Sequence, residues 1–264
     1  MFKHVEFLIQ GDLLPMTIGR LQVSPSFVIE EATSKKDLGG FFALAFVGVK
    51  DEPDFFRRAS LRIDFFLLLH ALMNGQAATY FQGVATPLST LDDLGKNRFS
   101  FSGYEEVVHL NEDMQSELSK PILLVKERFF QLEEDIDKIL DEHVGLALSY
   151  YYSAVQASSK SKFAVVIDLA MAAEALFSKE QPYTANLRRR LSSFVAQDEL
   201  ERKEISKKID EFYRLRGIIV HGEKKEIPLA DVRTASEHIR KAIDKALSSK
   251  LYSKAELIHE VDKS

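Results

Sequence analysis

The 264-residue sequence contains no cysteine, and this absence removes several kinds of chemistry at once. Without thiols the chain cannot form disulfides, bind an iron–sulfur cluster, hold zinc through sulfur or use a cysteine nucleophile. Tryptophan is also absent, whereas 19 phenylalanines supply most of the aromatic content. The remaining composition, 45% hydrophobic and 28% charged, is that of a globular protein with an ordinary core.

Long apolar runs are missing as well. The N-terminal stretch is interrupted by Glu6, Gln10 and Asp12, and no small-residue cleavage site of a signal peptide follows it. The longest apolar candidates, residues 39–49 and 65–73, reach only about half the length that is needed to cross a bilayer. We therefore expect a cytoplasmic protein that has no membrane partner.

Charge of one sign does not dominate the chain, since 35 Lys+Arg stand against 40 Asp+Glu and give a net charge of −5. This mild acidity argues against a protein coated with nucleic-acid-binding charge. The distribution is uneven, however: residues 1–134 carry a net −6, whereas residues 186–225 carry 11 Lys+Arg against 7 Asp+Glu, a net +4. A solvated helix face explains such a basic run as readily as a binding surface does.

The N-terminal part, residues 1–110, combines strand and helix patterns. Short β-prone runs bounded by turn residues predict two strands within residues 17–30 and further strands at residues 5–9, 41–49 and 79–81. The apolar period then changes over residues 54–74, which predicts a helix that is buried on a wide face and ended by Gly75. We expect an α+β domain that offers no catalytic motif. Its role is not determined by the sequence, which leaves a sensor, a regulator that binds a protein or ligand, and a substrate selector as the alternatives.

From residue 111 onward the sequence predicts helices throughout. Apolar spacing and turn signals predict them at residues 112–140, 143–158, 161–178, 185–196, 199–221, 231–248 and 251–261. The expected organisation is therefore an α+β domain at residues 1–110, a connecting helix at 111–139 and an all-α bundle at 140–264.

One of these predicted helices carries a carboxylate within its apolar stripe. Glu174 shares the stripe, at spacings of i, i+4, i+7, i+11 and i+14, with Phe163, Ile167, Ala170 and Phe177. A buried carboxylate needs a cation or several donors to offset its desolvation, so a cation should come from another helix. A carboxylate at the rim of the stripe, reaching solvent, is the simpler alternative.

The helix predicted at residues 199–221 repeats this pattern with a cation. Arg216 lies among Ile205, Ile209, Phe212 and Ile219 at the same spacings. It is therefore the natural partner for Glu174, unless it points into a groove formed with another molecule.

His221 follows Arg216 by five residues and precedes Gly222, which is typical of the last turn of a helix that ends at a glycine. On an ideal helix Arg216 and His221 lie about 140° apart around the axis and about 7.5 Å apart along it. Their side chains could flank a single phosphate group. Taken alone, however, one arginine and one histidine are more often structural than catalytic.

Residues 213–222, Tyr-Arg-Leu-Arg-Gly-Ile-Ile-Val-His-Gly, resemble the signature of the HEPN superfamily and in particular its Apea-like branch. That signature is an arginine, four to six residues and a histidine near the end of a late helix. Upstream, Ala-Glu-Ala-Leu at residues 173–176 resembles the family's glutamate-bearing helix, and Leu-Arg-Arg-Arg-Leu at residues 187–191 resembles its basic third helix. The resemblance extends over residues 140–250.

The resemblance implies an all-α bundle that forms a homodimer and, in many members, cleaves RNA without a metal ion or other cofactor. Arg216 and His221 would be the catalytic residues. His221 would transfer protons while the RNA 2′-OH attacks the adjacent phosphate, and Arg216 would hold the phosphate oxygens. The product would carry a 2′,3′-cyclic phosphate. The expected role is that of an effector in antiviral defence, a toxin or a stress-response enzyme.

The residues expected to support this site are Glu174, Gly217 and Tyr213, with Glu174 orienting Arg216 from the neighbouring helix. RNA would be bound by the basic residues Arg188, Arg189, Arg190, Arg214, Lys224 and Lys225. No metal-ligating residues are expected, because no cluster of His, Asp and Glu has the spacing of metal ligands.

Gly217 departs from the pattern of catalytic members, which commonly carry a polar residue directly after the motif arginine. Glycine weakens a helix interior by about 1 kcal/mol relative to alanine. It either lets the last turn bend and brings His221 closer to Arg216, or marks a member with weak or lost nuclease activity. The alternatives are a non-catalytic dimerisation module that binds RNA, a nucleotide or a protein, and an N-terminal small-molecule or peptide binder with a helical dimerisation tail.

Overall fold

The computed structural model describes the backbone at residues 2–10, 20–24, 27–31, 42–50, 54–75, 79–81, 85–86, 120–157, 161–222 and 226–263, and the side chains at residues 54, 57–75, 124–157, 161–222 and 226–263. The chain divides into two compact units. The first comprises Met1–Glu106 and Glu112–Ile136, and the second comprises Val107–Asn111 and Asp137–Ser264. The border between Ile136 and Asp137 lies within the predicted connecting helix.

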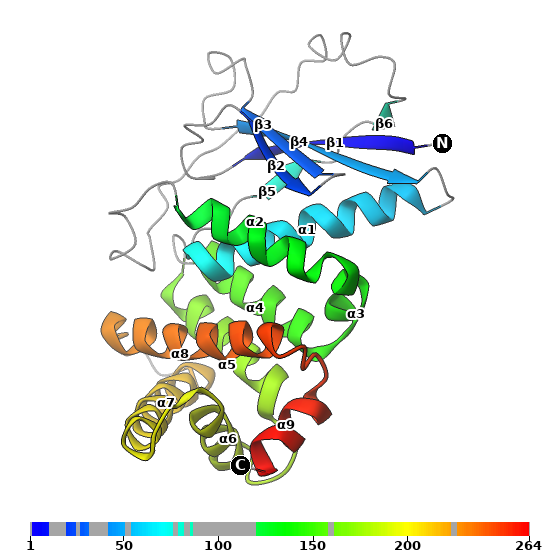
Figure 1. Cartoon of the computed structure of the whole chain (residues 1–264). Coiled ribbons are helices and arrows are strands. Elements are labelled where there is room, and N and C mark those ends of the chain that lie inside the picture. The colour runs from blue at the N-terminus through cyan, green and yellow to red at the C-terminus, as the bar shows by residue number, and fades with distance from the viewer. Residues whose placement is uncertain are drawn as a thin grey trace. The chain divides into compact units, whose positions relative to one another are not determined.

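The strands of the first unit are β1 (Phe2–Gln10), β2 (Arg20–Ser24), β3 (Phe27–Glu31), β4 (Phe42–Lys50), β5 (Thr79–Phe81) and β6 (Ala85–Thr86). Their backbones pair antiparallel in the order β2–β3–β4–β1–β5, with β6 also paired to β1 (Figure 1). The longest ladder joins β1 to β4, from Phe2 opposite Lys50 to Gln10 opposite Phe42. The segments β1 to β5 coincide with strand positions predicted from the sequence, whereas β6 was not predicted.

The helices of the first unit are α1 (Phe55–Asn74), α2 (Lys120–Leu132) and the short 3₁₀ helix η3 (Glu133–Asp135). As predicted, α1 ends at Gly75, whose φ of 65° is left-handed and whose N–H donates to the Ala71 carbonyl at 2.9 Å. The described core of this unit forms between α1 and α2, where the Phe129 ring lies 6.0 Å from that of Phe65 and 6.1 Å from that of Phe66.

The fold class predicted for the N-terminal part is wrong for the residues whose packing is described. Across all residues with described side chains, 86% are helical and none lies in a strand. The physical reason is the composition of α1, which buries apolar side chains on almost every side: of the seven apolar residues from Phe65 to Leu72, all but Leu68 are exposed by 3% or less. Such a helix requires contacts around most of its circumference, and α2 supplies part of them. The described packing is therefore helix on helix.

The remaining helices are α3 (Ile136–Asp141), α4 (His143–Ala157), α5 (Lys162–Phe177), α6 (Tyr183–Val195), α7 (Glu199–Val220), α8 (Leu229–Ser248) and α9 (Lys254–Lys263). They follow the predicted helices closely, except that the single helix expected at 112–140 is interrupted at η3 and continues as α3. Among the described residues, no helix combines the length and apolar character that a membrane span requires.

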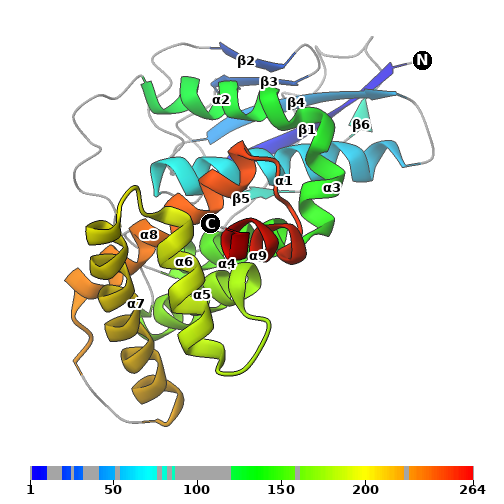
Figure 2. The same ribbon diagram turned by 60° about the horizontal axis from the view of Figure 1, so that its bottom comes forward.

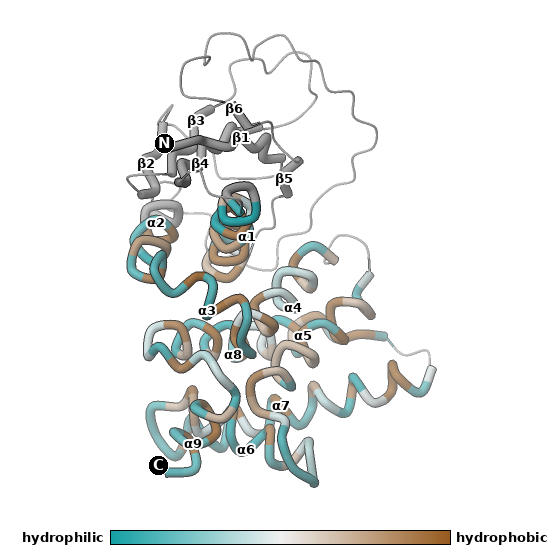
Figure 3. Tube along the Cα trace, turned by 90° about the vertical axis from the view of Figure 1, so that its right-hand side faces the viewer, coloured by the Kyte–Doolittle hydropathy of each residue, from teal (hydrophilic) through white to brown (hydrophobic). Residues whose placement is uncertain are grey.

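Helix α5 is the central helix of the second unit. It contacts α4, α6, α7, α8 and α9, and its inner face is formed by Val166, Leu169, Ala173 and Leu176, each fully buried. Figure 3 shows the apolar character of α5 beside the more hydrophilic α6. Helices α6 and α7 lie side by side at the outside of the bundle (Figure 2). This arrangement leaves one edge of α5 next to α7, where the candidate site lies.

Candidate active site

The C-terminal end of α7 is positioned by signals at both ends of the helix. At its start, the Asp198 carboxylate accepts the Glu201 N–H at 2.8 Å, while the Glu201 side chain accepts the Gln197 N–H at 2.7 Å. At its end, Gly222 has a left-handed φ of 76°, and its N–H donates to the Ile219 carbonyl at 3.0 Å. The predicted helix end at Gly222 is therefore confirmed, and His221 is the last residue before the turn.

Arg216 and Glu174 form the ion pair that their positions in the two stripes predicted. Arg216 Nη2 lies 3.5 Å from Glu174 Oε1, joining α7 to α5. Both side chains reach solvent, with 34% of Arg216 and 28% of Glu174 exposed. The pair therefore lies at the rim of the helix interface, where a second anion can approach the guanidinium.

The predicted apolar face of α5 is only partly buried. Ala170 and Phe177 are buried as expected, but Phe163 is 46% exposed and Ile167 is half-buried. The deepest face of α5 is rotated from the predicted stripe toward Val166 and Leu169. Glu174 consequently lies at the border between core and solvent, which combines the two interpretations that the sequence left open: it has a cation partner and it reaches water.

Tyr213 lies beneath this ion pair. Its hydroxyl donates to the Ala170 carbonyl at 3.2 Å, and its ring packs edge-on against Phe212. Burial raises the pKa of Tyr213 well above its ordinary value, and the nearby negative charge of Glu174 raises it further. The phenol therefore remains protonated and fixes α7 to α5 one turn away from Arg216.

His221 is exposed at the end of α7, and its backbone N–H donates to the Gly217 carbonyl at 3.1 Å. This bond keeps the helical pattern through Gly217. A Cβ added at Gly217 would meet no atom within 4 Å, so packing does not require a glycine there. The site thus brings Arg216, Glu174 and Tyr213 together, with His221 on the same helix one turn beyond Arg216.

The basic residues predicted to bind RNA are mostly paired with carboxylates. Arg188 Nη1 lies 2.7 Å from Asp210 Oδ1, and Arg214 Nη2 lies 2.7 Å from Oδ2 of the same carboxylate. Arg214 is nevertheless 77% exposed, so it remains accessible to a ligand.

Arg189 and Arg190 both pair with Asp262 of α9. The Arg189 contact measures 2.8 Å and the Arg190 contact 3.1 Å, and Arg190 also donates to the Phe177 carbonyl at 3.4 Å. Because the Arg190 side chain is only 4% exposed, it holds helices together and cannot reach an RNA backbone. The predicted Lys224 and Lys225 lie outside the described residues.

Sequence reasoning missed Lys254 of α9, whose Nζ donates to the Ser178 carbonyl at 3.0 Å just beyond α5. Burial lowers the pKa of Lys254, and the negative charge of Glu174 acts against that shift. Lys254 therefore adds a second positive charge to the surroundings of Glu174. No local pattern marks it, because the hydrogen bond joins residues 76 positions apart.

Among the described residues, no group of three or more His, Asp and Glu side chains is arranged to hold a metal ion. A scan against family models and searches of curated proteins and of solved structures found no match to this chain.

Proposed function

We propose that this protein is a metal-independent endoribonuclease of the HEPN type that acts as a defence, toxin or stress effector. The observation that carries the proposal is the Arg216–Glu174 pair at the rim of α5 and α7, with His221 exposed at the end of the same helix. The R-x4-H spacing and the basic helix before it support the same assignment.

Arg216 is suited to holding a phosphate. Its single contact to Glu174 is long, at 3.5 Å, so most of the N–H groups of the guanidinium are available to an incoming anion. Glu174 limits the rotamers of Arg216 and offsets its charge before RNA binds. An arginine oriented in this way stabilises the charge that develops on the phosphate oxygens in the transition state.

His221 supplies the proton transfer in this proposal. Its exposed imidazole can take the proton of the 2′-OH or return one to the leaving 5′ oxygen. Attack of the 2′ oxygen on phosphorus breaks the bond to the 5′ oxygen and leaves a 2′,3′-cyclic phosphate and a 5′-OH. A homodimer would bring two such motifs into one cleft, so that each proton-transfer role has its own histidine.

The decisive experiment is cleavage of structured and unstructured RNA by the purified chain in EDTA. Arg216→Ala and His221→Ala should each lower the rate by about 100-fold or more. Matched controls are Arg202→Ala, an exposed arginine near the start of α7, and His259→Ala, an exposed histidine of α9. Both controls should cleave at the wild-type rate, and the products should carry cyclic phosphate ends. Cleavage that needs a metal and survives both site substitutions would refute the site.

The second candidate function is a non-catalytic dimerisation module that binds RNA, a nucleotide or a protein. Gly217 favours it, because that position carries no polar group beside Arg216 and no packing contact explains the glycine. Absence of cleavage under every condition, together with a stable dimer in sedimentation, would select this candidate. Gly217→Asn tests the link directly, since the open space beside Gly217 accepts a side chain and a gain of cleavage would identify the missing group.

A further inference from the structure

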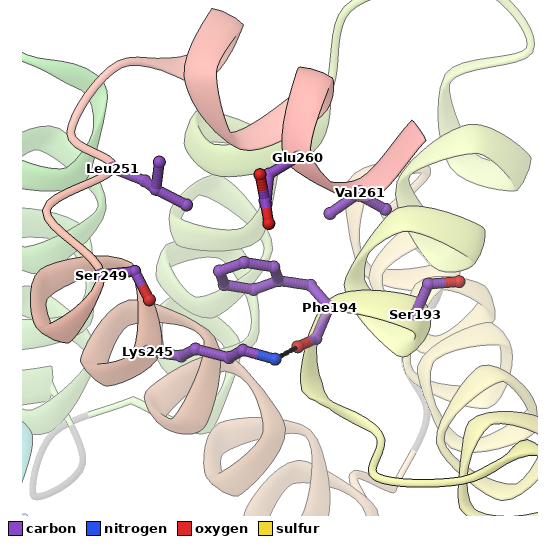
Figure 4. A pocket seen from close by; sticks show the side chains of 7 residues that line it. All are labelled: Ser193, Phe194, Lys245, Ser249, Leu251, Glu260 and Val261. Carbon is purple, nitrogen blue, oxygen red and sulfur yellow. Dashed lines mark hydrogen bonds between the residues drawn. The ribbon is translucent and has the colours of Figure 1, made fainter. Parts of the chain in front are cut away.

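A cavity of about 340 Å³ opens in the second unit between α6, α8, α9 and the segment that joins α8 to α9 (Figure 4). Its apolar lining consists of Phe194, Leu251 and Val261, and Lys245 and Glu260 supply its charges. The volume lies at the lower end of the range of small-molecule sites, which are typically apolar with a few placed polar groups. Neither Arg216 nor His221 lines it.

The two charged residues reach the cavity from different helices. Lys245 comes from α8, whereas the Glu260 carboxylate of α9 points toward the Phe194 ring from the other side (Figure 4). They form no ion pair with each other, and Glu260 has no hydrogen bond or ion pair to any other described residue. The cavity therefore presents a positive and a negative group on opposite sides of an aromatic ring.

Lys245 is held in place, but its ammonium group still has N–H donors available for a ligand. Its Nζ donates to the Phe194 carbonyl at 2.6 Å and lies 4.9 Å from the centroid of the Phe194 ring. A lysine ammonium has three N–H donors, so two remain for a ligand. Ser249, on the Lys245 side of the ring, adds a hydroxyl that makes no hydrogen bond to the other described side chains (Figure 4).

We propose that this cavity binds a small zwitterion whose carboxylate and ammonium groups are separated by an apolar spacer, as in an ω-amino acid. The ligand carboxylate contacts Lys245 and Ser249, its ammonium group contacts Glu260, and the spacer covers Phe194 and Leu251. Lys245 and Glu260 are both exposed at the mouth of the cavity, so a simple anion or a simple cation would gain an ion pair with only one of them. A ligand that carries both charges can pair with Lys245 and Glu260 at the same time.

Binding would also act on α9. Val261 and Glu260 line the cavity, and the next residue, Asp262, pairs with Arg189 and Arg190 of α6. A ligand that joins α8 to α9 should therefore slow amide hydrogen exchange in α9, because it adds contacts on the side of the helix next to that ion pair.

The test uses 6-aminohexanoate as the probe and the full chain, with binding followed by NMR titration and calorimetry. Hexanoate and hexylamine, each lacking one charge, should bind at least about tenfold more weakly. Lys245→Gln keeps a donor for the Phe194 carbonyl and Glu260→Gln keeps the shape, so both should fold and both should weaken binding by a similar factor. Lys263→Gln, an exposed residue of α9 outside the cavity, is the matched control and should bind as the wild type does.

No saturable binding at tens of millimolar would overturn the proposal. It would also be overturned if either variant bound 6-aminohexanoate as tightly as the wild type does, or if hexanoate bound the wild type as tightly as 6-aminohexanoate does. Nα-acetyl-lysine presents the same two charges as a peptide ending in lysine, and tighter binding of this probe would assign that source of the zwitterion. His221→Ala should bind the probe normally. The result is therefore independent of whether the chain cleaves RNA.

Discussion

Two groups of charged residues in the second unit are held in different ways. Arg190 is almost completely buried and meets Asp262 at 3.1 Å, while its neighbour Arg189 reaches the same carboxylate from solvent at 2.8 Å. Arg216 meets Glu174 at a looser 3.5 Å, with about a third of its side chain exposed. The first group, called the Arg190–Asp262 cluster below, has little freedom to exchange partners, whereas the Arg216–Glu174 pair can accept a second anion.

The difference shows that a run of consecutive charged residues and a single charged residue on an apolar stripe differ in what they predict about ion-pair partners. Consecutive arginines on a helix point in different directions, so their total charge says little about any one surface. A single arginine within an apolar stripe is constrained by the helices around it and must have a specific partner. Paired charges at a rim are therefore stronger site candidates than a longer basic run.

The largest expected effect is on the free energy of unfolding, and it should differ between Arg190 and its neighbour Arg189 in the Arg190–Asp262 cluster. Arg190→Ala should lower the free energy of unfolding by about 3 kcal/mol, because it creates a cavity and removes partners from Asp262 and the buried Phe177 carbonyl. Arg189→Ala removes an exposed partner of the same carboxylate and should cost less than about 1 kcal/mol. Urea unfolding measures both values, and similar losses would show that burial does not distinguish the two arginines.

Gly145 of α4 and Gly217 of α7 allow a similar comparison between a crowded and an open position on a helix backbone. A Cβ at Gly145 would clash with the Ile139 carbonyl oxygen, so Gly145→Ala should destabilise the protein by about 2 kcal/mol. Gly217→Ala meets no atom and should stabilise α7 by up to about 1 kcal/mol. Thermal unfolding of both variants measures the difference. A loss of stability in Gly217→Ala would show that the end of α7 needs the freedom of glycine.

The same comparison explains which structural features could be predicted from the sequence and which could not. Helix positions were predictable because apolar spacing and end signals such as Gly75 and Gly222 are local. The Glu174–Arg216 contact was predictable because each residue interrupts an apolar stripe at the same phase. The pairing of Arg188 with Asp210 and of Arg189 and Arg190 with Asp262 was not predictable, because ion pairs between different helices leave no local pattern in the chain. The Arg214–Asp210 pair, by contrast, has the local i,i+4 spacing.

The fold class of the first unit could not be predicted because it also depends on contacts between residues that are distant in the sequence. Alternating and turn-bounded runs correctly located the strand segments, but the class depends on which side chains share a core. The described core is formed by Phe65 and Phe66 of α1 against Phe129 of α2, residues more than sixty positions apart. The apolar run in α1 indicated burial without indicating its partner.

A smaller effect is expected at Tyr213, which links the core to the Arg216–Glu174 pair. Tyr213→Phe keeps the ring but removes the hydroxyl that donates to the Ala170 carbonyl, and should cost about 1 kcal/mol in unfolding free energy. If the chain cleaves RNA, the rate should fall only severalfold, because Tyr213 positions Arg216 indirectly. Tyr252→Phe, at a buried tyrosine of the segment before α9, serves as the control for general loosening of the fold. A rate loss as large as that of Arg216→Ala would contradict this positioning role.

The smallest effect concerns the pH dependence of the Arg190–Asp262 cluster. Hydrogen bonds from Arg190, and then from Arg189, hold the pKa of Asp262 below its ordinary value. Because the folded pKa is lower than the unfolded one, the stabilisation is complete above the unfolded pKa of about 3.9 and is lost as pH falls through the folded pKa. Asp262 is 37% exposed, so solvent and salt should keep the effect small.

The measurement is the urea midpoint of the wild type and of Asp262→Asn from neutral pH to about pH 3. The gap between the two midpoints should stay constant down to about pH 5 and narrow below about pH 4, since protonation removes the charge that asparagine lacks at every pH. A gap that persists at low pH would mean that the ionised carboxylate is not what stabilises the cluster. In that case the packing of Arg190 and its hydrogen bond to the Phe177 carbonyl would account for its stability.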